Sequence, residues 1–160
     1  MTQNNTIDTV EVKKEYYESG ALRWENPYVN GKMHGIVKHY YETGALMHKT
    51  PFVNGKEHGI DKWYYESGAL EREVPFVNGK EHGIVKFYSE SGALWRETPY
   101  VKGTVHGIGK GYYESGALQV EIPYVNGKRH GIVRCYEIAT LNIVRLTLYD
   151  KDRTVASVKV

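Results

Sequence analysis

The sequence predicts an all-β protein, an elongated antiparallel meander of tandem 24-residue β-hairpins in a single-layer, twisted or curved sheet. The first observation is a 24-residue motif that opens near Tyr-Tyr-Glu-Ser-Gly-Ala-Leu and occurs five times between residues 16 and 135. The second is a pair of turn signals in each copy, about twelve residues apart. The third is the abundance of β-branched and aromatic residues between those turns, which favours strands. A fixed period of this length marks a repeat array whose units are stable only when stacked.

The array is expected to form one domain over residues 1–160, because no linker interrupts the repeat. Residues 1–15 supply an N-terminal capping strand, with Thr9 to Tyr17 as its strand-like part. Residues 16–135 hold the five repeats, and residues 136–160 hold a degenerate repeat and a C-terminal capping hairpin. Atypical terminal units of this kind cover the open edges of a repeat sheet.

Each repeat contains an Asn-Gly turn and a Ser-Gly turn. Asn-Gly between strand-like segments predicts a type I′ hairpin turn, since both residues accept a positive φ. The Ser-Gly element predicts a three-residue loop with glycine in the left-handed conformation. One strand and one turn fit in twelve residues, so we expect about eleven or twelve strands and, at 4.8 Å per strand, a body about 55 Å long.

A proline recurs inside the second strand of every unit. Proline cannot donate to a strand ladder, so it is expected at a bulge, a bend or a strand end. A bend in every hairpin would curve or coil the sheet. The prolines are residues 27, 51, 75, 99 and 123.

Composition restricts the function classes. A formal net charge of +2 gives no global attraction to nucleic acid. The single cysteine, Cys135, excludes an internal disulfide framework and is expected to be a small apolar filler. The opening MTQNNTIDTV has neither the basic nor the apolar part of a signal peptide, and no segment has the apolar length of a membrane span, so we expect a cytoplasmic protein.

Five histidines stand before glycine at 24-residue intervals. They would lie about 10 Å apart, two strand spacings, which is too far for one metal ion. We therefore expect structural hydrogen bonds in the turn and no metal site. Repeated columns of His, Glu and Ser also lack the convergent geometry of a catalytic site, so no catalytic residue, cofactor or enzymatic activity is expected. The histidines are residues 34, 58, 82, 106 and 130.

The Tyr-Tyr-Glu-Ser-Gly-Ala-Leu and Asn-Gly-Lys-x-His-Gly elements, over about residues 12 to 137, resemble the MORN repeat in its longer bacterial variant. The resemblance implies stacked β-hairpins in an elongated sheet. It also implies a scaffold or partner-binding role, with phospholipid contact proposed for some members. Bacterial relatives are often named YwqK-family antitoxins, which implies neutralisation of a toxin by direct binding. No catalytic residue follows from the resemblance.

Comparison of the five copies separates constant from variable columns. The Ile36, Lys38 and Tyr40 columns are constant apart from Arg134, and by strand alternation they share one face. Constant columns are expected to stack the units on one another. The Val37 and His39 columns vary, which leaves them available to a partner.

Large residues at unrepeated positions form the candidate partner-binding set, because Trp and Arg are frequent anchors of interfaces. The alternative is that these side chains only shelter the apolar surface of a thin sheet. The set is Trp24, Trp63, Trp95, Phe87, Arg72 and Arg96.

A basic column at residues 38, 62, 86, 110 and 134 has two interpretations. It could bind the phosphates of nucleic acid or acidic phospholipid. Alternatively, it could pair across strands with an acidic column at residues 25, 73, 97 and 121 that is broken only by Lys49. The strand register decides between them.

The leading hypothesis is thus a non-enzymatic protein-binding module, such as an antitoxin, immunity protein or inhibitor that blocks its target, as a monomer or an edge-mediated homo-oligomer. The alternative is a scaffold that binds membrane phospholipid or self-assembles. A third is a small-ligand or nucleotide binder. In the fourth unit two extra glycines lower the strand propensity of Lys102 to Gly111, which predicts the weakest or most bent point of the array there.

Overall fold

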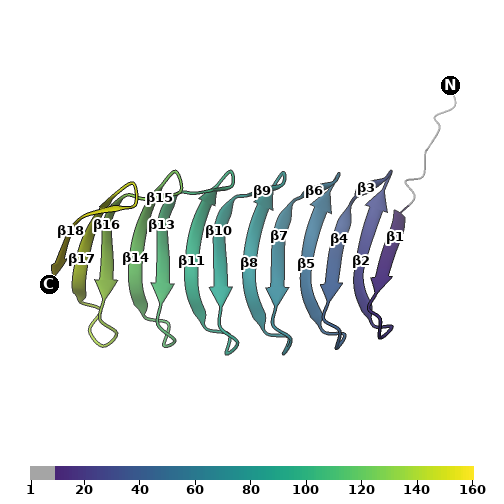
Figure 1. The fold of residues 1–160 in the computed structure, drawn as a ribbon, viewed down its shortest axis with the longest axis horizontal. Coiled ribbons are helices and arrows are strands. Elements are labelled where there is room, and N and C mark those ends of the chain that lie inside the picture. The colour runs from purple at the N-terminus through teal and green to yellow at the C-terminus, as the bar shows by residue number, and fades with distance from the viewer. Residues whose placement is uncertain (1–9) are drawn as a thin grey trace, which may run out of the picture.

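The computed structural model describes residues 10–160, which form one 18-stranded antiparallel sheet without helices (Figure 1). The predicted all-β meander of hairpins is confirmed. The strands follow one another along the long axis in chain order. They are β1 (Val10–Tyr16), β2 (Leu22–Val29), β3 (Lys32–Met33), β4 (Gly35–Tyr40), β5 (Leu46–Val53), β6 (Lys56–Glu57), β7 (Gly59–Tyr64), β8 (Leu70–Val77), β9 (Lys80–Glu81), β10 (Gly83–Tyr88), β11 (Leu94–Val101), β12 (Thr104–Val105), β13 (Gly107–Tyr112), β14 (Leu118–Val125), β15 (Lys128–Arg129), β16 (Gly131–Tyr136), β17 (Ile143–Asp150) and β18 (Arg153–Lys159).

Five of these strands are two residues long and account for most of the excess over the predicted eleven or twelve. The Asn30-Gly31 turn has φ of 51° and 73°, as a type I′ turn requires. The two residues after it form β3 and pair with the end of β2. The chain then leaves this ladder, so β2 meets β4 only further along, at Trp24 and Glu25.

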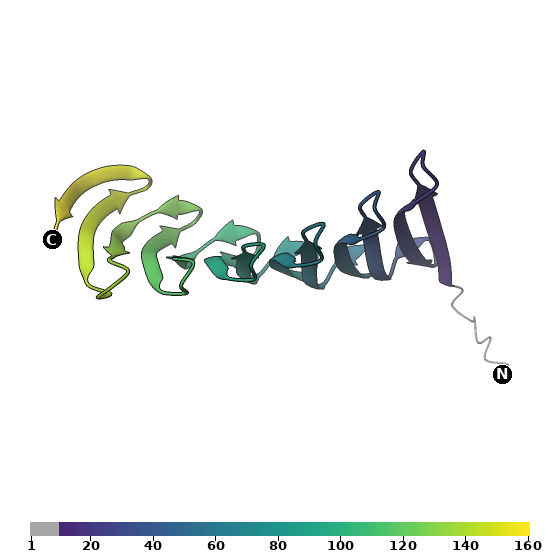
Figure 2. The same cartoon turned by 90° about the horizontal axis from the view of Figure 1, so that it is seen from below.

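Pro27 lies where β2 changes partner from β4 to β3. Its carbonyl accepts a bond from the His34 amide at 3.0 Å, and its ring lies 3.2 Å from where a Cβ on Gly35 would stand. The proline therefore marks a bend at which the missing donor is tolerated. Since the arrangement recurs in each unit, the strands curve along the whole array (Figure 2).

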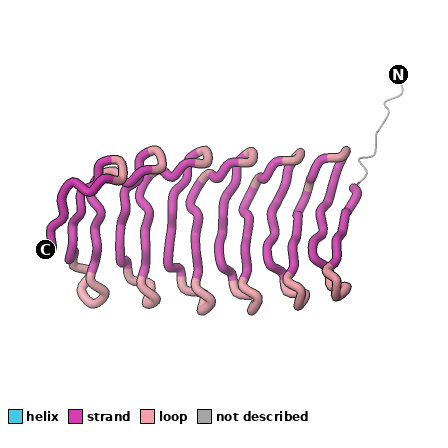
Figure 3. Tube along the Cα trace, in the orientation of Figure 1, coloured by secondary structure: helices cyan, strands magenta, loops and turns pink. Residues whose placement is uncertain are grey.

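The other turn has the predicted three-residue loop. Gly20 has φ of 85°, its amide donates to the Tyr17 carbonyl at 3.0 Å, and the Tyr17 amide donates to the Ala21 carbonyl at 2.9 Å. Loops of this kind gather along one long edge of the sheet, and the Asn-Gly turns gather along the opposite edge (Figure 3).

Hydrogen bonds with donors outside the three compared columns join neighbouring units. The Tyr17 hydroxyl donates to the Tyr40 carbonyl of the next unit at 2.7 Å. At the opposite edge the Gly55 amide donates to the Met33 carbonyl at 2.8 Å. Equivalent tyrosine bonds recur at Tyr41, Tyr65 and Tyr113, but Ser89 interrupts the series in the fourth unit.

The two faces of the sheet differ in burial. One, which we call the valine face, carries Val37, Val74 and Val85, exposed by 4%, 7% and 3%. The other, the lysine face, carries the Lys38 column and the Ile36 column, and Ile36 is 45% exposed. In a single layer such burial comes from neighbours on the same face, which the curvature brings together. The interpretation that the Val37 column is available to a partner is therefore wrong, because these side chains form the core.

The terminal strands flank the repeats. β1 pairs with β2 at one end, and β17 and β18 pair at the other through a turn at Lys151 and Asp152. Residues 1–9 of the expected N-terminal cap lie outside the described part of the chain. β13 keeps the length and register of its counterparts, so its glycines do not interrupt the sheet, and the local weakness expected there stays a prediction. No helix within residues 10–160 could cross a membrane.

Candidate partner-binding row on the valine face

One line of directly opposed residues crosses seven strands of the valine face. Strand register pairs each residue with the next, so their side chains are nearest neighbours. We call this line the aromatic-arginine row. It consists of Trp24, His39, His48, Trp63, Arg72, Phe87 and Arg96.

Ring contacts connect the middle of the row. His39 and His48 stack with centroids 4.3 Å apart, and the centroids of His48 and Trp63 are 4.2 Å apart. The Arg72 guanidinium lies 4.1 Å from the centroid of the Trp63 ring, within cation–π range. The Arg96 guanidinium lies 6.0 Å from the Phe87 ring. The row is thus a half-buried surface of stacked planar groups.

The structure brings five of the six predicted residues into this row and places the sixth beside it. Trp95 follows the first residue of β11, next to the register shift opposite Phe87 and Tyr88, and is 44% exposed. Its ring centroid is 5.5 Å from that of Phe87. Sequence reasoning missed His39 and His48, although they occupy the same two columns as Trp63 and Arg72.

Burial sets the charge state of the two histidines. Burial lowers the pKa of His48 to about 4, helped by His39 and Arg72 and opposed by Asp61. The pKa of His39 is lowered by burial and by Arg23. The middle of the row is consequently uncharged at neutral pH, and Arg72 and Arg96 supply its positive charge.

Asp61 is a buried carboxylate that holds Trp63, at the centre of the row, in position. It is 7% exposed and occupies the column that holds valine in the first, third and fifth units. The Thr50 hydroxyl donates to its Oδ1 at 2.6 Å, and the Trp63 indole nitrogen donates to its Oδ2. Buried carboxylates need such donors. Asp61 therefore holds the Trp63 ring upright between His48 and Arg72.

Two polar atoms of the row are buried without a hydrogen-bond partner among the described residues, His48 Nδ1 and Arg72 Nε. Each such atom lowers stability by about 1–3 kcal/mol. Buried polar atoms that lack a hydrogen-bond partner concentrate at functional sites, where residues are selected for function as well as for folding.

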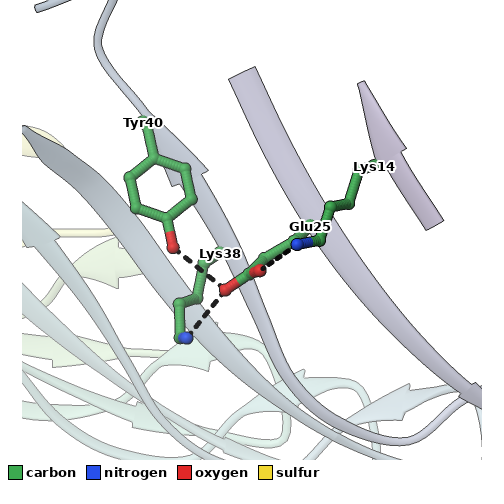
Figure 4. Close-up of polar contacts among 4 residues, drawn as sticks. All are labelled: Lys14, Glu25, Lys38 and Tyr40. Carbon is green, nitrogen blue, oxygen red and sulfur yellow. Dashed lines mark hydrogen bonds and ion pairs between the residues drawn. The ribbon is translucent and has the colours of Figure 1, made fainter. Parts of the chain in front are cut away.

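The lysine face places the basic column and the acidic column opposite one another across the strands, as a ladder of alternating charges. Glu25 accepts from Lys38 Nζ and from the Tyr40 hydroxyl at 2.8 and 3.0 Å, with Lys14 at 3.8 Å (Figure 4). The Lys38 contact is the main cause of the lowered pKa of Glu25. In the basic column, Lys38 and Lys62 form ion pairs with glutamates. The other three, Lys86, Lys110 and Arg134, lie opposite glutamates in register but form no ion pair within 4.0 Å among the described residues.

The histidines before glycine lie at the Asn-Gly edge. The rings of His34 and His82 accept from the amides of Asn54 and Lys102 in the next unit at 3.5 and 3.4 Å, and His130 lies 3.2 Å from Asp150. Within residues 10–160 no group of three or more His, Cys, Asp or Glu side chains is placed to hold a metal ion. Cys135 is a free, half-buried thiol in line with the row.

The hairpins of residues 33–126 match the MORN repeat variant in four consecutive copies, at 33–54, 57–78, 81–102 and 105–126. The chain belongs to the MORN repeat variant family. The matched segments make up more than half of it, and the hairpins on either side continue the same register. A search of curated proteins found no match to this MORN array.

Proposed function

We propose that this MORN array is a non-enzymatic, cytoplasmic module that binds a protein partner along the aromatic-arginine row. The observation that carries the proposal is the row itself, a continuous line of rings and guanidinium groups across seven strands. Tryptophan and arginine dominate the binding energy of many interfaces. An antitoxin, immunity or inhibitor protein that covers its target is the role most consistent with such a surface.

The mechanism is steric and depends on preorganisation. The stacked neighbours and Asp61 hold the rings in position before any partner arrives. Less side-chain entropy is then lost on binding, which favours affinity. No bond needs to be made or broken, because occupation of the target surface is sufficient to block it.

The lipid-binding scaffold is less well supported. Binding to acidic phospholipid needs uncompensated lysines and arginines, whereas on the lysine face Lys38 and Lys62 each pair with a glutamate at 2.8 Å. These two ion pairs compensate part of the positive charge of the face.

The test compares the two faces. The intact chain is immobilised and used to capture proteins from a lysate of the organism that carries the gene. In parallel, one variant removes row residues (Trp24→Ala with Arg72→Ala), and a matched variant removes exposed residues of the lysine face (Ile36→Ala with Ile60→Ala). Circular dichroism first establishes that all three proteins fold alike. The captured protein is then purified and its affinity for each is measured by calorimetry.

The proposal predicts one dominant protein that the parent and the lysine-face variant bind equally and the row variant binds at least about tenfold more weakly. Equal binding by both variants, or loss only in the lysine-face variant, would refute it. Capture of phospholipid or of a second copy of the chain in place of another protein would favour the scaffold.

A further inference from the structure

The row of large side chains ends at a hollow over β13. The next two residues in line are Gly111 and Val120, and Gly109 lies two residues before Gly111 on the same face. In the other four units the position of Gly109 holds valine or aspartate. The missing side chains leave a hollow of about 360 Å³. We call it the glycine hollow; the residues that line it include Trp95, Arg96, Thr98, Val120, Ile122 and Tyr124.

Backbone conformation does not explain these two glycines. The turn glycines of the array have positive φ, but Gly109 and Gly111 are not among the residues with positive φ and lie in a regular strand. Their effect is on space. A Cβ on Gly109 would lie 3.2 Å from Tyr124 Cε2, and one on Gly111 would lie 2.9 Å from Val120 Cγ1. The Tyr124 and Val120 side chains thus lie over the glycine backbone and form the floor of the hollow.

The lining combines aromatic surface with the cation of Arg96, whereas Lys110, which also borders the hollow, belongs to the lysine face. Trp95 and Tyr124 bring rings to the hollow, and Trp95 is 44% exposed. Arg96 Nε donates to the Thr98 hydroxyl at 3.1 Å, which orients the guanidinium. Within residues 10–160 no carboxylate forms an ion pair with Arg96. Its terminal nitrogens can therefore receive an anion, and carboxylates pair with arginine in two-pronged geometry.

We propose that the glycine hollow binds one aromatic side chain of the protein partner together with an adjacent carboxylate. The ring lies among the side chains of Trp95, Val120 and Tyr124, and the carboxylate pairs with Arg96. The size is adequate, since a cavity of about 150 Å³ admits benzene. This inference rests on the proposed function and names the chemistry by which the partner is anchored.

A partner segment fits better than a free small molecule because the hollow continues the row. Arg96 belongs to both, and the Phe87 ring lies beside the Trp95 ring with centroids 5.5 Å apart. A segment that places its aromatic residue in the hollow has the rest of the row directly in its path. Well-packed pockets surrounded by other contacts are where interface anchors cluster.

The test is a set of NMR titrations of the intact chain with three probes. N-acetyltyrosine supplies ring and carboxylate, N-acetyltyrosine amide supplies the ring alone, and N-acetylalanine supplies the carboxylate alone. We expect amide shifts confined to the hollow with N-acetyltyrosine, about threefold weaker binding of the amide, and none with N-acetylalanine.

Two variants fill the hollow with residues that other units carry. Gly109→Val copies Val85, and Gly111→Phe copies Phe87. Because a Cβ at either glycine would crowd Tyr124 or Val120, circular dichroism and the melting temperature first establish that each variant folds like the parent. Either variant is expected to weaken binding of N-acetyltyrosine at least about tenfold. Ser89→Tyr is the control, because it also restores a repeat residue but lies outside the hollow, and it is expected to leave binding unchanged.

Absent shifts at the hollow, or equal binding by parent and filled variants, would overturn the inference. Equal binding of N-acetylalanine and N-acetyltyrosine would also overturn it, since the ring would then contribute nothing. Such a failure is distinguishable from failure of the proposed function, because Trp24 and Arg72, which test the latter, do not line the hollow.

Discussion

Lys49 is the one break in the alternating charges of the lysine face, and its reversal is the most informative test of the ladder. Register places Lys49 opposite both Lys38 and Lys62. The equivalent position in the next unit is Glu73, which accepts from Lys62 at 2.8 Å and from the Tyr88 hydroxyl at 3.2 Å. Lys49→Glu should therefore relieve two like-charge contacts and give the Tyr64 hydroxyl an acceptor.

The size of the gain follows from these contacts. Relief of each cross-strand repulsion contributes about 0.2–1 kcal/mol. New ion pairs add little, since Lys38 and Lys62 are already paired at half-exposed sites. A hydroxyl-to-carboxylate bond contributes about 1 kcal/mol. We expect a total of about 1.5–3 kcal/mol, which raises the melting temperature by about 3–12 °C in a chain of this length.

The assay is thermal unfolding followed by circular dichroism at low and high salt. Lys49→Gln is the control, because it removes the repulsion without adding a carboxylate, and it should give about half the gain. The advantage of Lys49→Glu should shrink at high salt as the charges are screened. If Lys49→Glu melts at or below Lys49→Gln at low salt, the account of the ladder is refuted.

Three further predictions address other contacts. The pKa of His48 is lowered from 6.5 to about 4, so the unfolded chain takes up the proton before the folded chain does as the pH falls. The free energy of unfolding should therefore fall by about 1–2 kcal/mol between pH 6.5 and 4, after allowance for solvent screening. Urea unfolding should show a smaller fall in the free energy of unfolding for His48→Phe, and an equal fall would contradict the assignment. Ser89→Tyr should restore the hydroxyl bond to the next unit that Tyr65 makes at 2.8 Å, and so raise the free energy of unfolding by about 1 kcal/mol. The parent is expected to be least protected from hydrogen exchange around Lys102 to Gly111, and this exchange should slow in the variant. Uniform protection in the parent would count against that expectation. Gly59 has φ of 114°, and a Cβ there would stand 2.9 Å from Pro51 Cγ, so Gly59→Ala should lower the free energy of unfolding by about 2–3 kcal/mol. Gly44 has φ of 88° but faces open space, so Gly44→Ala should lower the melting temperature clearly less than Gly59→Ala does. Comparable losses in the two variants would show that crowding by Pro51 is unimportant.

The fold was largely predictable because its signals are local and repeated. Asn30-Gly31 requires one turn type, and Gly20 requires the other, so the hairpins follow from short segments. Strand alternation then separates the Lys38 column from the His39 column. The short strands such as β3 were missed, because they depend on where β2 and β4 part at Pro27, and this is a tertiary effect.

The faces were harder to assign. Sequence comparison treated the variable Val37 column as available, yet curvature of the single layer buries it to 4% exposure. A slip of one residue would exchange the faces, and columns alone do not fix the register. Five of the six candidate residues do lie in the aromatic-arginine row, but His39 and His48 were not predicted as anchors from the sequence. The local weakness expected at Gly109 and Gly111 stays a prediction, and the hollow beside these glycines was not foreseen from the sequence.

The most direct test of the central claim, that the valine face holds the partner, is site-specific photo-crosslinking. The photoreactive amino acid p-benzoylphenylalanine is introduced at Phe87 or at Ile84, which lie on the same strand β10 but on opposite faces. Irradiation in cells that contain the partner should give a crosslinked product from position 87 and none from position 84. Crosslinking from position 84 alone, or equally from both, would contradict the account.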